Sequence, residues 1–207
     1  MVYRMDHSIG RVIQAIENIG QTENTLFFFT NDNGGAKSNG ASNNPLRGAK
    51  GTLLDGGIKV PFIMSWKKRL NSKTISDKIV STLDIVPTVA NVSGIVLPLD
   101  RQYDGINLLK DMEKEETMHF ERTLYWRVNW ASAIRHNGHK LIRLPNQELW
   151  LFDLRNDPTE TTNIYSTSPA IAKDLTLKLT NWESNTPTAA WEANNMWKSR
   201  TLQGYHQ

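Results

Sequence analysis

One stretch of the chain, residues 25–62, constrains the fold more than any other. It begins with a dense apolar segment at 25–30, passes through the polar segment 31–35 into a long loop rich in Gly, Ser and Asn, and ends in a second apolar segment at 60–66. A strand that is apolar on both faces is typical of a sheet covered by helices on each side. In such sheets ligands gather outside the carboxyl ends of the strands. The stretch therefore predicts an α/β fold with a functional site in the loop.

Two adjacent residues directly after the first apolar segment, Asp32 and Asn33, are candidate metal ligands. Carboxylate and amide oxygens are hard ligands that suit Ca²⁺ or Mg²⁺. The alternative interpretation of the same residues is a solvated turn. The pair supplies about two or three oxygens, whereas Ca²⁺ takes about six to eight. The chain offers no second acidic pair as an obvious complement, so we predict that Asp32 and Asn33 form part of a metal site.

Lys50 is the candidate for contact with an anion. Four glycines between residues 48 and 57 surround it, and glycine lets the backbone approach a ligand closely. Lysine is a compact point charge that suits a tetrahedral oxyanion. The alternative is an exposed loop lysine without a ligand. Arg47 is a second candidate for substrate contact, although a structural salt bridge to Asp55 is the favoured interpretation of that residue.

The composition excludes several classes of function. The chain has 207 residues and a net charge of +3, and its longest basic run is Lys67-Lys68-Arg69, which argues against nucleic-acid binding. It contains no cysteine, so disulfides, thiolate metal sites and cysteine nucleophiles are excluded. No apolar run reaches the roughly 18 residues of a membrane span. The first residues lead into an amphipathic helix, and we expect no signal peptide there.

Helical periodicity marks two helices in the first half of the chain. Apolar residues at steps of three and four predict a helix over 3–19. A second helix is expected over 79–92, where Pro87 either kinks the helix or lies in its first turn if the helix begins at Asp84. The strand that should precede the first helix of a doubly wound fold is missing. We therefore expect such an architecture to be present only in part.

The pattern changes in the second half of the chain. Residues 95–121 read as irregular, and four short strands of an antiparallel meander follow, with Asn137-Gly138 as a strong hairpin signal. A helix over 169–182 is expected to pack across this small sheet. From residue 186 the chain is polar, and we expect an extension there. The four expected strands are 123–128, 131–135, 139–144 and 149–154.

These elements predict an α/β fold in three parts. Residues 1–117 form the C-terminal part of an α/β domain, residues 118–185 form a small antiparallel sheet with a helix, and residues 186–207 form a polar extension. We expect four tryptophans to belong to the core of the small sheet rather than to a platform that stacks on sugars. They are Trp126, Trp130, Trp150 and Trp182.

At the loop the chain resembles the C-terminal half of the sulfatase family. Thr-Asn-Asp-Asn-Gly-Gly at 30–35 and Leu-Arg-Gly-Ala-Lys-Gly-Thr-Leu-Leu-Asp-Gly-Gly-Ile-Lys-Val-Pro-Phe at 46–62 are similar to a family pattern. That pattern is a strand ending in Ser-Asp-Asn-Gly, followed by Gly-x-Lys-Gly-x-x-x-Glu-Gly-Gly-x-Arg-Val-Pro. Asp55 and Lys59 preserve the charge of the usual Glu and Arg. The resemblance covers about residues 3–185 and implies a partial alkaline-phosphatase-like sandwich.

The resemblance implies a role for each matching residue. Asp32 and Asn33 would be two ligands of the active-site Ca²⁺, and Lys50 would contact the sulfate and the bridging ester oxygen. Family chemistry uses a formylglycine made from a Cys/Ser-x-Pro-x-Arg motif, and its hydrate attacks sulfur. This chain has no such motif. We therefore expect the C-terminal part of a sulfuric ester hydrolase acting on aryl or carbohydrate sulfates, inactive as an isolated chain.

Two alternatives stay open. A non-catalytic, split subunit would need an N-terminal partner, and an exposed half-sheet predicts self-association or co-purification with that partner. A phosphate or phosphonate ester hydrolase would keep the fold and change the reaction, and only the missing nucleophile could decide between them. The resemblance suggests a periplasmic or secreted location, which the sequence itself leaves unknown.

Overall fold

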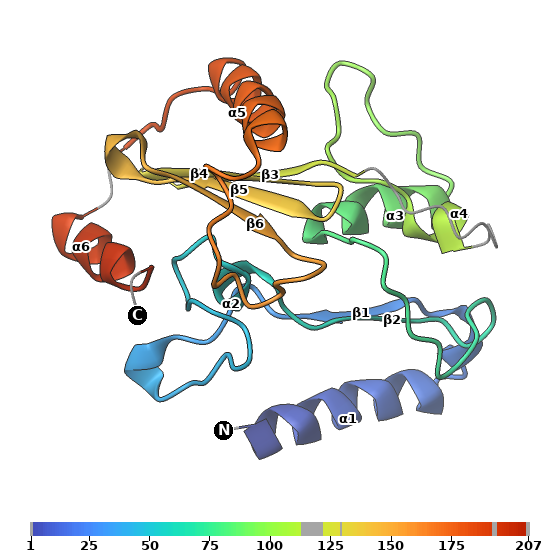
Figure 1. Ribbon diagram of the computed structural model, residues 1–207. Coiled ribbons are helices and arrows are strands. Elements are labelled where there is room, and N and C mark those ends of the chain that lie inside the picture. The colour runs from blue at the N-terminus through green and yellow to red at the C-terminus, as the bar shows by residue number, and fades with distance from the viewer. Residues whose placement is uncertain (1, 113–121, 129, 192–193, 206–207) are drawn as a thin grey trace. The chain divides into compact units, whose positions relative to one another are not determined.

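The computed structural model describes residues 2–112, 122–128, 130–191 and 194–205 (Figure 1). The chain forms two compact units. Unit 1 consists of Met1–Thr30 with Pro61–Met118, and unit 2 consists of Asn31–Val60 with His119–Gln207. The loop after the first strand thus packs with the C-terminal part of the chain. The boundary that we predicted after residue 117 falls outside the described residues.

A two-stranded antiparallel sheet organises unit 1. Strand β1 pairs with strand β2, with Thr30 opposite Phe62, and Phe28 meets Phe62 edge to face at 6.1 Å between ring centroids. The first helix and both strands lie where the sequence predicted them. The elements of unit 1 are α1 (Val2–Asn18), η1 (Thr22–Asn24), β1 (Phe27–Thr30), β2 (Phe62–Ser65), η3 (Thr82–Asp84), α3 (Ile85–Val92) and α4 (Leu108–Met112).

Helix α1 carries the apolar face that its periodicity predicted, but that face is exposed. None of the residues of α1 is buried, and Tyr3 and Val12 are 80% and 60% exposed. The described part of unit 1 therefore leaves an apolar helix face in contact with solvent.

The two alternatives for Pro87 are decided by a capping box before α3. The Ser81 hydroxyl accepts the N–H of Leu83 at 3.3 Å, and the Asp84 carboxylate accepts the N–H of Ser81 at 2.7 Å. The helix therefore begins next to Asp84 and Pro87 lies in its first turn, where a missing N–H costs nothing. Asp84 also accepts the N–H of Ile106 at 2.9 Å. Helix α4 lies in a region that we expected to be irregular.

Unit 2 contains the predicted antiparallel meander. Its sheet has the order β3-β4-β5-β6, and the strands are β3 (Leu124–Val128), β4 (Ala131–His136), β5 (His139–Arg143) and β6 (Leu149–Asp153). Asn137 and Gly138 have φ values of 48° and 79°, as a two-residue hairpin with a type I′ turn requires. The short helix η4 (Pro145–Gln147) connects β5 to β6.

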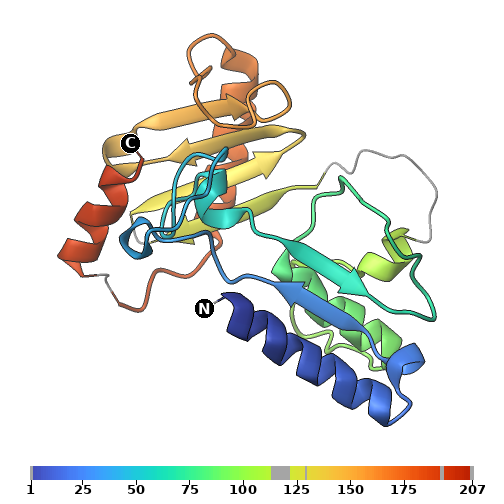
Figure 2. The same ribbon diagram turned by 90° about the horizontal axis from the view of Figure 1, so that it is seen from below.

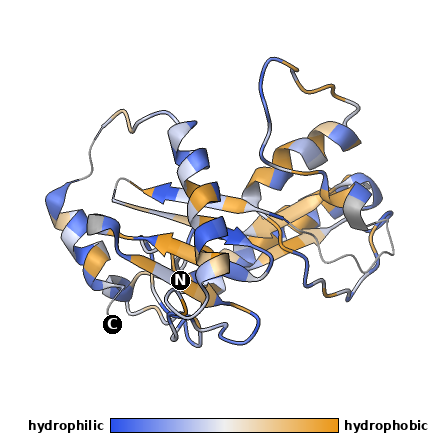
Figure 3. Cartoon of the chain, turned by 45° about the horizontal axis from the view of Figure 1, so that its top comes forward, coloured by the Kyte–Doolittle hydropathy of each residue, from blue (hydrophilic) through white to orange (hydrophobic). Residues whose placement is uncertain are grey.

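Both faces of this sheet are covered, because successive strand residues point to opposite faces. Helix α5 (Pro169–Ser184) packs on one face and the loop 31–60, with η2 (Lys37–Asn39) and α2 (Asp55–Ile58), lies across the other (Figures 1 and 2). Figure 3 shows that hydrophobic residues line the strands. The α5 side buries Ile134, Leu141, Leu151, Leu175 and Leu179, and the loop side buries Leu53, Leu54, Ala133, Ile142, Phe152 and Tyr205.

The polar extension expected after residue 186 is more structured than the sequence indicated. It contains helix α6 (Asn195–Gln203), and the side chain of Tyr205 just beyond α6 is fully buried. The pattern of α6 is mostly polar, so hydropathy alone did not reveal its contact with the core. None of the helices in the described ranges is long and apolar enough to cross a bilayer.

Candidate functional site

Backbone hydrogen bonds join the two parts of the predicted site. The N–H of Gly34 donates to the carbonyl of Gly57 at 2.9 Å, and the N–H of Lys50 donates to the carbonyl of Gly35 at 3.1 Å. The segment that follows Asp32 and Asn33 is therefore bonded directly to the residue predicted to contact the anion. The structure brings these three predicted residues into one loop of unit 2.

The side chain of Asn43 closes the same loop from inside. Its Oδ1 accepts the N–H of Gly35 at 2.7 Å, and its Nδ2 donates to the carbonyls of Gly35 and Gly48 at 2.9 and 3.1 Å. Sequence reasoning passed over Asn43, because it looked like one polar residue among many in the loop.

The glycines around Lys50 serve the packing of the loop itself. A Cβ on Gly56 would lie 2.5 Å from the carbonyl oxygen of Arg47, and one on Gly57 would lie 2.2 Å from that of Thr52. No side chain fits at such distances. We expected these two glycines to let the backbone approach a ligand. The structure corrects this, because the nearest atoms that pack against them belong to the backbone of the loop.

Lys50 projects from a tight turn over residues 49–52. The N–H of Thr52 donates to the carbonyl of Ala49 at 2.9 Å, and the Thr52 hydroxyl donates to the same carbonyl at 2.9 Å. Gly51 has a φ of 96°, which a residue with a Cβ adopts only under strain. The side chain of Lys50 is exposed, and its ammonium forms no ion pair with any residue that the structure describes.

The metal donors fit only part of a Ca²⁺ shell. Asp32 is exposed and Asn33 is half-buried. Within the described ranges, no group of three or more His, Cys, Asp or Glu side chains is placed to hold a metal ion. Two adjacent donors match the incomplete set expected from the sequence and fall short of the about six oxygens that Ca²⁺ needs. The assignment of Asp32 and Asn33 as ligands stays a prediction.

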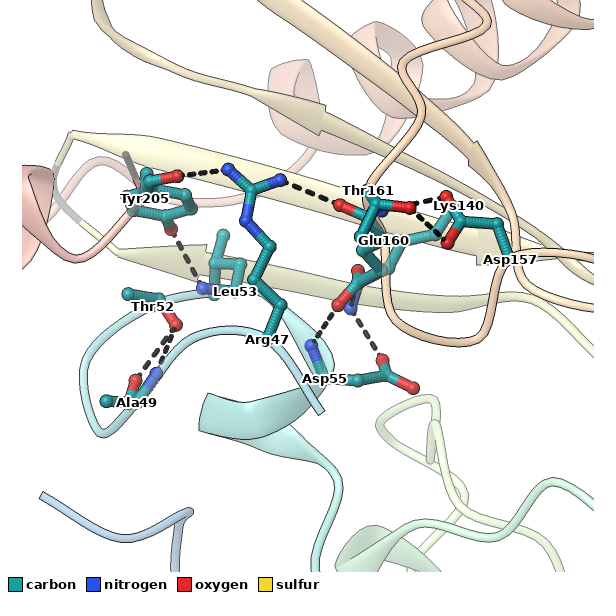
Figure 4. Close-up of polar contacts among 10 residues, drawn as sticks. All are labelled: Arg47, Ala49, Thr52, Leu53, Asp55, Lys140, Asp157, Glu160, Thr161 and Tyr205. Carbon is teal, nitrogen blue, oxygen red and sulfur yellow. Dashed lines mark hydrogen bonds and ion pairs between the residues drawn. The ribbon is translucent and has the colours of Figure 1, made fainter. Parts of the chain in front are cut away.

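A buried ion cluster, formed by Lys140, Asp55 and Glu160, holds the loop on the sheet (Figure 4). The ammonium of Lys140 lies 2.6 Å from the Asp55 carboxylate and 2.7 Å from the Glu160 carboxylate. The Glu160 carboxylate also accepts the N–H of Asp55 at 2.5 Å. Burial raises the pKa of Glu160, and the charge of Lys140 acts in the opposite direction. The cluster joins strand β5 to the loop and to the segment after β6.

Arg47 makes structural contacts within the same region. Its guanidinium donates to the carbonyls of Glu160 and Tyr205 at 2.7 and 2.5 Å and lies 5.1 Å from the ring centroid of Trp150. The salt bridge that we favoured between Arg47 and Asp55 does not form among the residues that the structure describes, and Lys140 pairs with Asp55 instead. Substrate contact by Arg47 stays a prediction.

Tyr205 anchors the C-terminal segment beneath the loop. Its hydroxyl accepts the N–H of Leu53 at 2.8 Å (Figure 4). Burial raises the pKa of Tyr205 to about 12, the bond from Leu53 lowers it, and the charge of Glu160 raises it. Neither Tyr205 nor Lys140 was identified from the sequence. The sequence did contain a sign that Lys140 is buried. Residues two apart in a strand point to the same face, and Lys140 stands two positions before the apolar Ile142.

A cavity of about 190 Å³ lies elsewhere in unit 2, and none of the predicted site residues lines it. Its wall includes Ser132, Arg143 and Glu183. The Glu183 carboxylate accepts hydrogen bonds from both Ser132 and Arg143, so these polar groups are already paired with one another.

Comparisons with protein-family models place the chain beside known proteins. A model described as "Sulfatase" matches residues 1–95, and one described as "N-sulphoglucosamine sulphohydrolase, C-terminal" matches residues 49–185. A "Sulfatase" of Formosa agariphila is 29% identical over 223 residues, covering 92% of this chain and 40% of that protein. The N-acetylgalactosamine-6-sulfatase of Mus musculus is 33% identical over 144 residues, covering 67% of this chain and 27% of that protein.

Solved structures agree with these matches. The crystal structure of Ps i-CgsB has a TM-score of 0.86 at 29% identity and covers 99% of this chain and 46% of that one. Another structure holds Ps i-CgsB in complex with k-i-k-neocarrahexaose. The phosphonate monoester hydrolase of Agrobacterium radiobacter shares the fold, with a TM-score of 0.70 at 24% identity over 89% of this chain and 40% of that one. The chain spans less than half the length of these relatives.

Removal of the central cation should destabilise unit 2 strongly. Lys140→Met leaves two buried carboxylates without their partner, which costs about 3–5 kcal/mol in comparable sites. Lys178→Met is the matched control, because Lys178 pairs with Asp174 one helical turn away on a partly exposed surface and such pairs are worth about 0.3–0.5 kcal/mol. Urea unfolding monitored by circular dichroism measures both. Equal losses in the two variants would contradict a stabilising role for the cluster.

Tyr205 should make the protein sensitive to alkali. Its pKa is higher in the folded chain, about 12, than the roughly 10 of an unfolded tyrosine. Its contribution to stability is therefore complete below pH 10 and is lost as the pH rises towards 12. The loss is on the order of 2–3 kcal/mol. Urea unfolding at pH 9 and pH 11.5 should show a smaller drop for Tyr205→Phe than for the wild type.

The matched control for that measurement is Tyr3→Phe, since Tyr3 is exposed. This variant should keep the pH dependence of the wild type. Tyr205→Phe itself should be less stable at pH 9, because the buried N–H of Leu53 loses its acceptor, at a cost of about 1–3 kcal/mol. An unchanged alkaline drop in Tyr205→Phe would show that Tyr205 is not the group that titrates.

Proposed function

Because the chain belongs to the sulfatase family, we propose that it supplies one wall of the active site of a sulfuric ester hydrolase. In this proposal Lys50 contacts the sulfate, and Asp32 and Asn33 supply two ligands of a Ca²⁺ ion. The observation that carries it is the bond from the Lys50 N–H to the carbonyl of Gly35. That bond fixes Lys50 beside the segment in which the two metal ligands lie.

The family assignment also agrees with the predicted fold. The α/β architecture with a small antiparallel sheet and a helix is confirmed by the likeness to Ps i-CgsB over 99% of the chain. The fold alone does not fix the reaction. The proposal for the reaction therefore rests on the residues of the loop.

The proposed role of Lys50 follows from where charge develops. When the S–O bond of a sulfate ester breaks, the bridging oxygen gains negative charge. A fixed ammonium next to that oxygen stabilises the transition state more than the ground state, which accelerates the step. The tight turn over 49–52 limits the movement of the Lys50 backbone. Less binding free energy is therefore lost in ordering the loop when the substrate binds. A bound Ca²⁺, held in part by Asp32 and Asn33, would add positive charge to the site.

We further propose that the isolated chain does not turn over sulfate esters. The sequence lacks a Cys/Ser-x-Pro-x-Arg motif, so it offers no residue for the nucleophile that the family uses. A complete site would require a partner that carries this motif, such as the N-terminal half of a sulfatase, and self-association is the alternative partner for the same surface. The exposed apolar face of α1 supports such a contact, since large exposed apolar patches mark interaction sites. A periplasmic or secreted location belongs to the same proposal.

For the substrate we propose aryl or carbohydrate sulfate esters. The sulfatase names of the relatives and the complex of Ps i-CgsB with k-i-k-neocarrahexaose support this class. The alternative is a phosphonate or phosphate ester, which is compatible with the fold shared with the phosphonate monoester hydrolase. Both anions are tetrahedral, so Lys50 alone does not separate them.

The test is binding of inorganic sulfate, with phosphate as the competing anion, to ¹⁵N-labelled chain in the presence of CaCl₂. We expect the amide resonances of Lys50 and Gly51 to shift with sulfate, and affinity to fall about tenfold or more in Lys50→Gln, as for a charged contact worth about 1.5–3 kcal/mol. Lys73→Gln, an exposed lysine of unit 1, is the control and should bind like the wild type.

Two outcomes would sink the proposal. Sulfate affinity that is unchanged in Lys50→Gln would remove Lys50 from the site, and tighter binding of phosphate would favour the alternative reaction. A chromogenic aryl sulfate tests inactivity in the same samples. Calcium-dependent multiple turnover by this chain would contradict the claim that the nucleophile is absent.

A further inference from the structure

Helix α6 lies directly against the turn that carries Lys50. A Cβ placed on Gly51 would be 3.0 Å from Oγ1 of Thr201 and 3.1 Å from Cζ2 of Trp197. The indole ring therefore touches the residue next to Lys50. Because neighbouring Cα atoms are about 3.8 Å apart, the ring and the base of the lysine side chain are separated by a single residue.

Buried contacts other than Trp197 hold α6 in this place. Thr201 and Tyr205 are almost completely buried, and the Tyr205 hydroxyl accepts the N–H of Leu53 at 2.8 Å. Arg47 donates to the carbonyl of Tyr205. These bonds connect both the end of α6 and the segment after it to the loop that contains Lys50.

Trp197 is more exposed than a tryptophan of the hydrophobic core. It keeps 43% of its surface accessible, and it takes part in none of the aromatic pairs or cation–π contacts found within the described chain. Thr201 is the only residue of α6 that is buried, so the packing of the helix does not depend on covering the indole. The exposed indole contacts Gly51, and Gly51 follows the exposed Lys50 in the chain. An apolar ring and a lysine residue therefore lie at the same part of the loop.

We propose that Trp197 and Lys50 form a substrate subsite in which the indole packs against the ring of a sulfate ester while Lys50 contacts its sulfate. Binding sites combine apolar and aromatic surface with a few placed polar groups, and an aryl ring or the C–H face of a sugar ring fits the indole face. Trp197 is then a specificity-determining residue that selects esters with a flat or ring-shaped alcohol. The inference rests on the proposed function, because Lys50 supplies the sulfate contact.

The experiment compares two ligands, inorganic sulfate and 4-nitrophenyl sulfate, by isothermal titration with the chain in CaCl₂. The wild type should bind the ester more tightly than sulfate. Trp197→Ala should weaken binding of the ester by about tenfold, because one aromatic contact and the apolar surface around it are lost. The same variant should leave the affinity for sulfate within about twofold of the wild type. Trp197→Phe should recover most of the ester affinity, since it keeps an aromatic face.

The matched control is Trp191→Ala, which removes a tryptophan that is 79% exposed and should change neither affinity. Equal losses for ester and sulfate in Trp197→Ala would show that the indole only supports the turn, and no loss for either would show no contact. Each result overturns the inference and leaves the proposed function standing. A wild type that binds neither ligand overturns both, and a wild type without preference for the ester overturns the inference alone.

Discussion

The structure of unit 2 depends on one buried ammonium. Lys140 lies between Asp55 and Glu160 with essentially no exposure to solvent. Bringing three charges out of water costs several kcal/mol per ion, and the pairing repays that cost only with close geometry and further hydrogen bonds. The bond from the Asp55 N–H to Glu160 is such a hydrogen bond. A slip of the loop by one residue would leave charges unpaired, so we interpret the cluster as the feature that fixes the loop in one position.

The position of the loop on the sheet determines where the candidate site residues lie. Gly56 and Gly57 pack against the backbone at Arg47 and Thr52, and the segment at Gly34 and Gly35 bonds to that layer. Lys50 and the two candidate metal ligands then lie in a loop whose backbone is held by many short contacts. An active site gains from such preorganisation, because less free energy is lost in ordering it during the reaction. The sequence itself contains no Cys/Ser-x-Pro-x-Arg motif.

Local sequence patterns predicted the helices and strands well. They did not predict contacts between residues that are far apart in the sequence. The meander was predictable because apolar residues alternate along each strand and Asn137-Gly138 suits a type I′ turn. The sequence left two possibilities for α3, a kink at Pro87 or a helix that begins at Asp84. Proline restricts the backbone only at and next to its own position, so it could not decide between them. The pairing of Asp55 was wrong, because the partner Lys140 lies 85 residues away and Arg47 looked nearer. Tyr205 was missed because an isolated aromatic in a polar segment has no apolar neighbours at helical or strand spacing to mark it as part of the core.

Native-state hydrogen exchange of individual amides, measured by NMR on the wild-type chain, shows whether the loop bearing Lys50 is held as firmly as the sheet. We expect the N–H groups of Lys50, Gly56 and Gly57 to exchange with protection close to that of Leu141 in strand β5, because all open only when unit 2 unfolds. Exchange of the loop amides at the rate of an unstructured peptide, while Leu141 stays protected, would contradict this expectation.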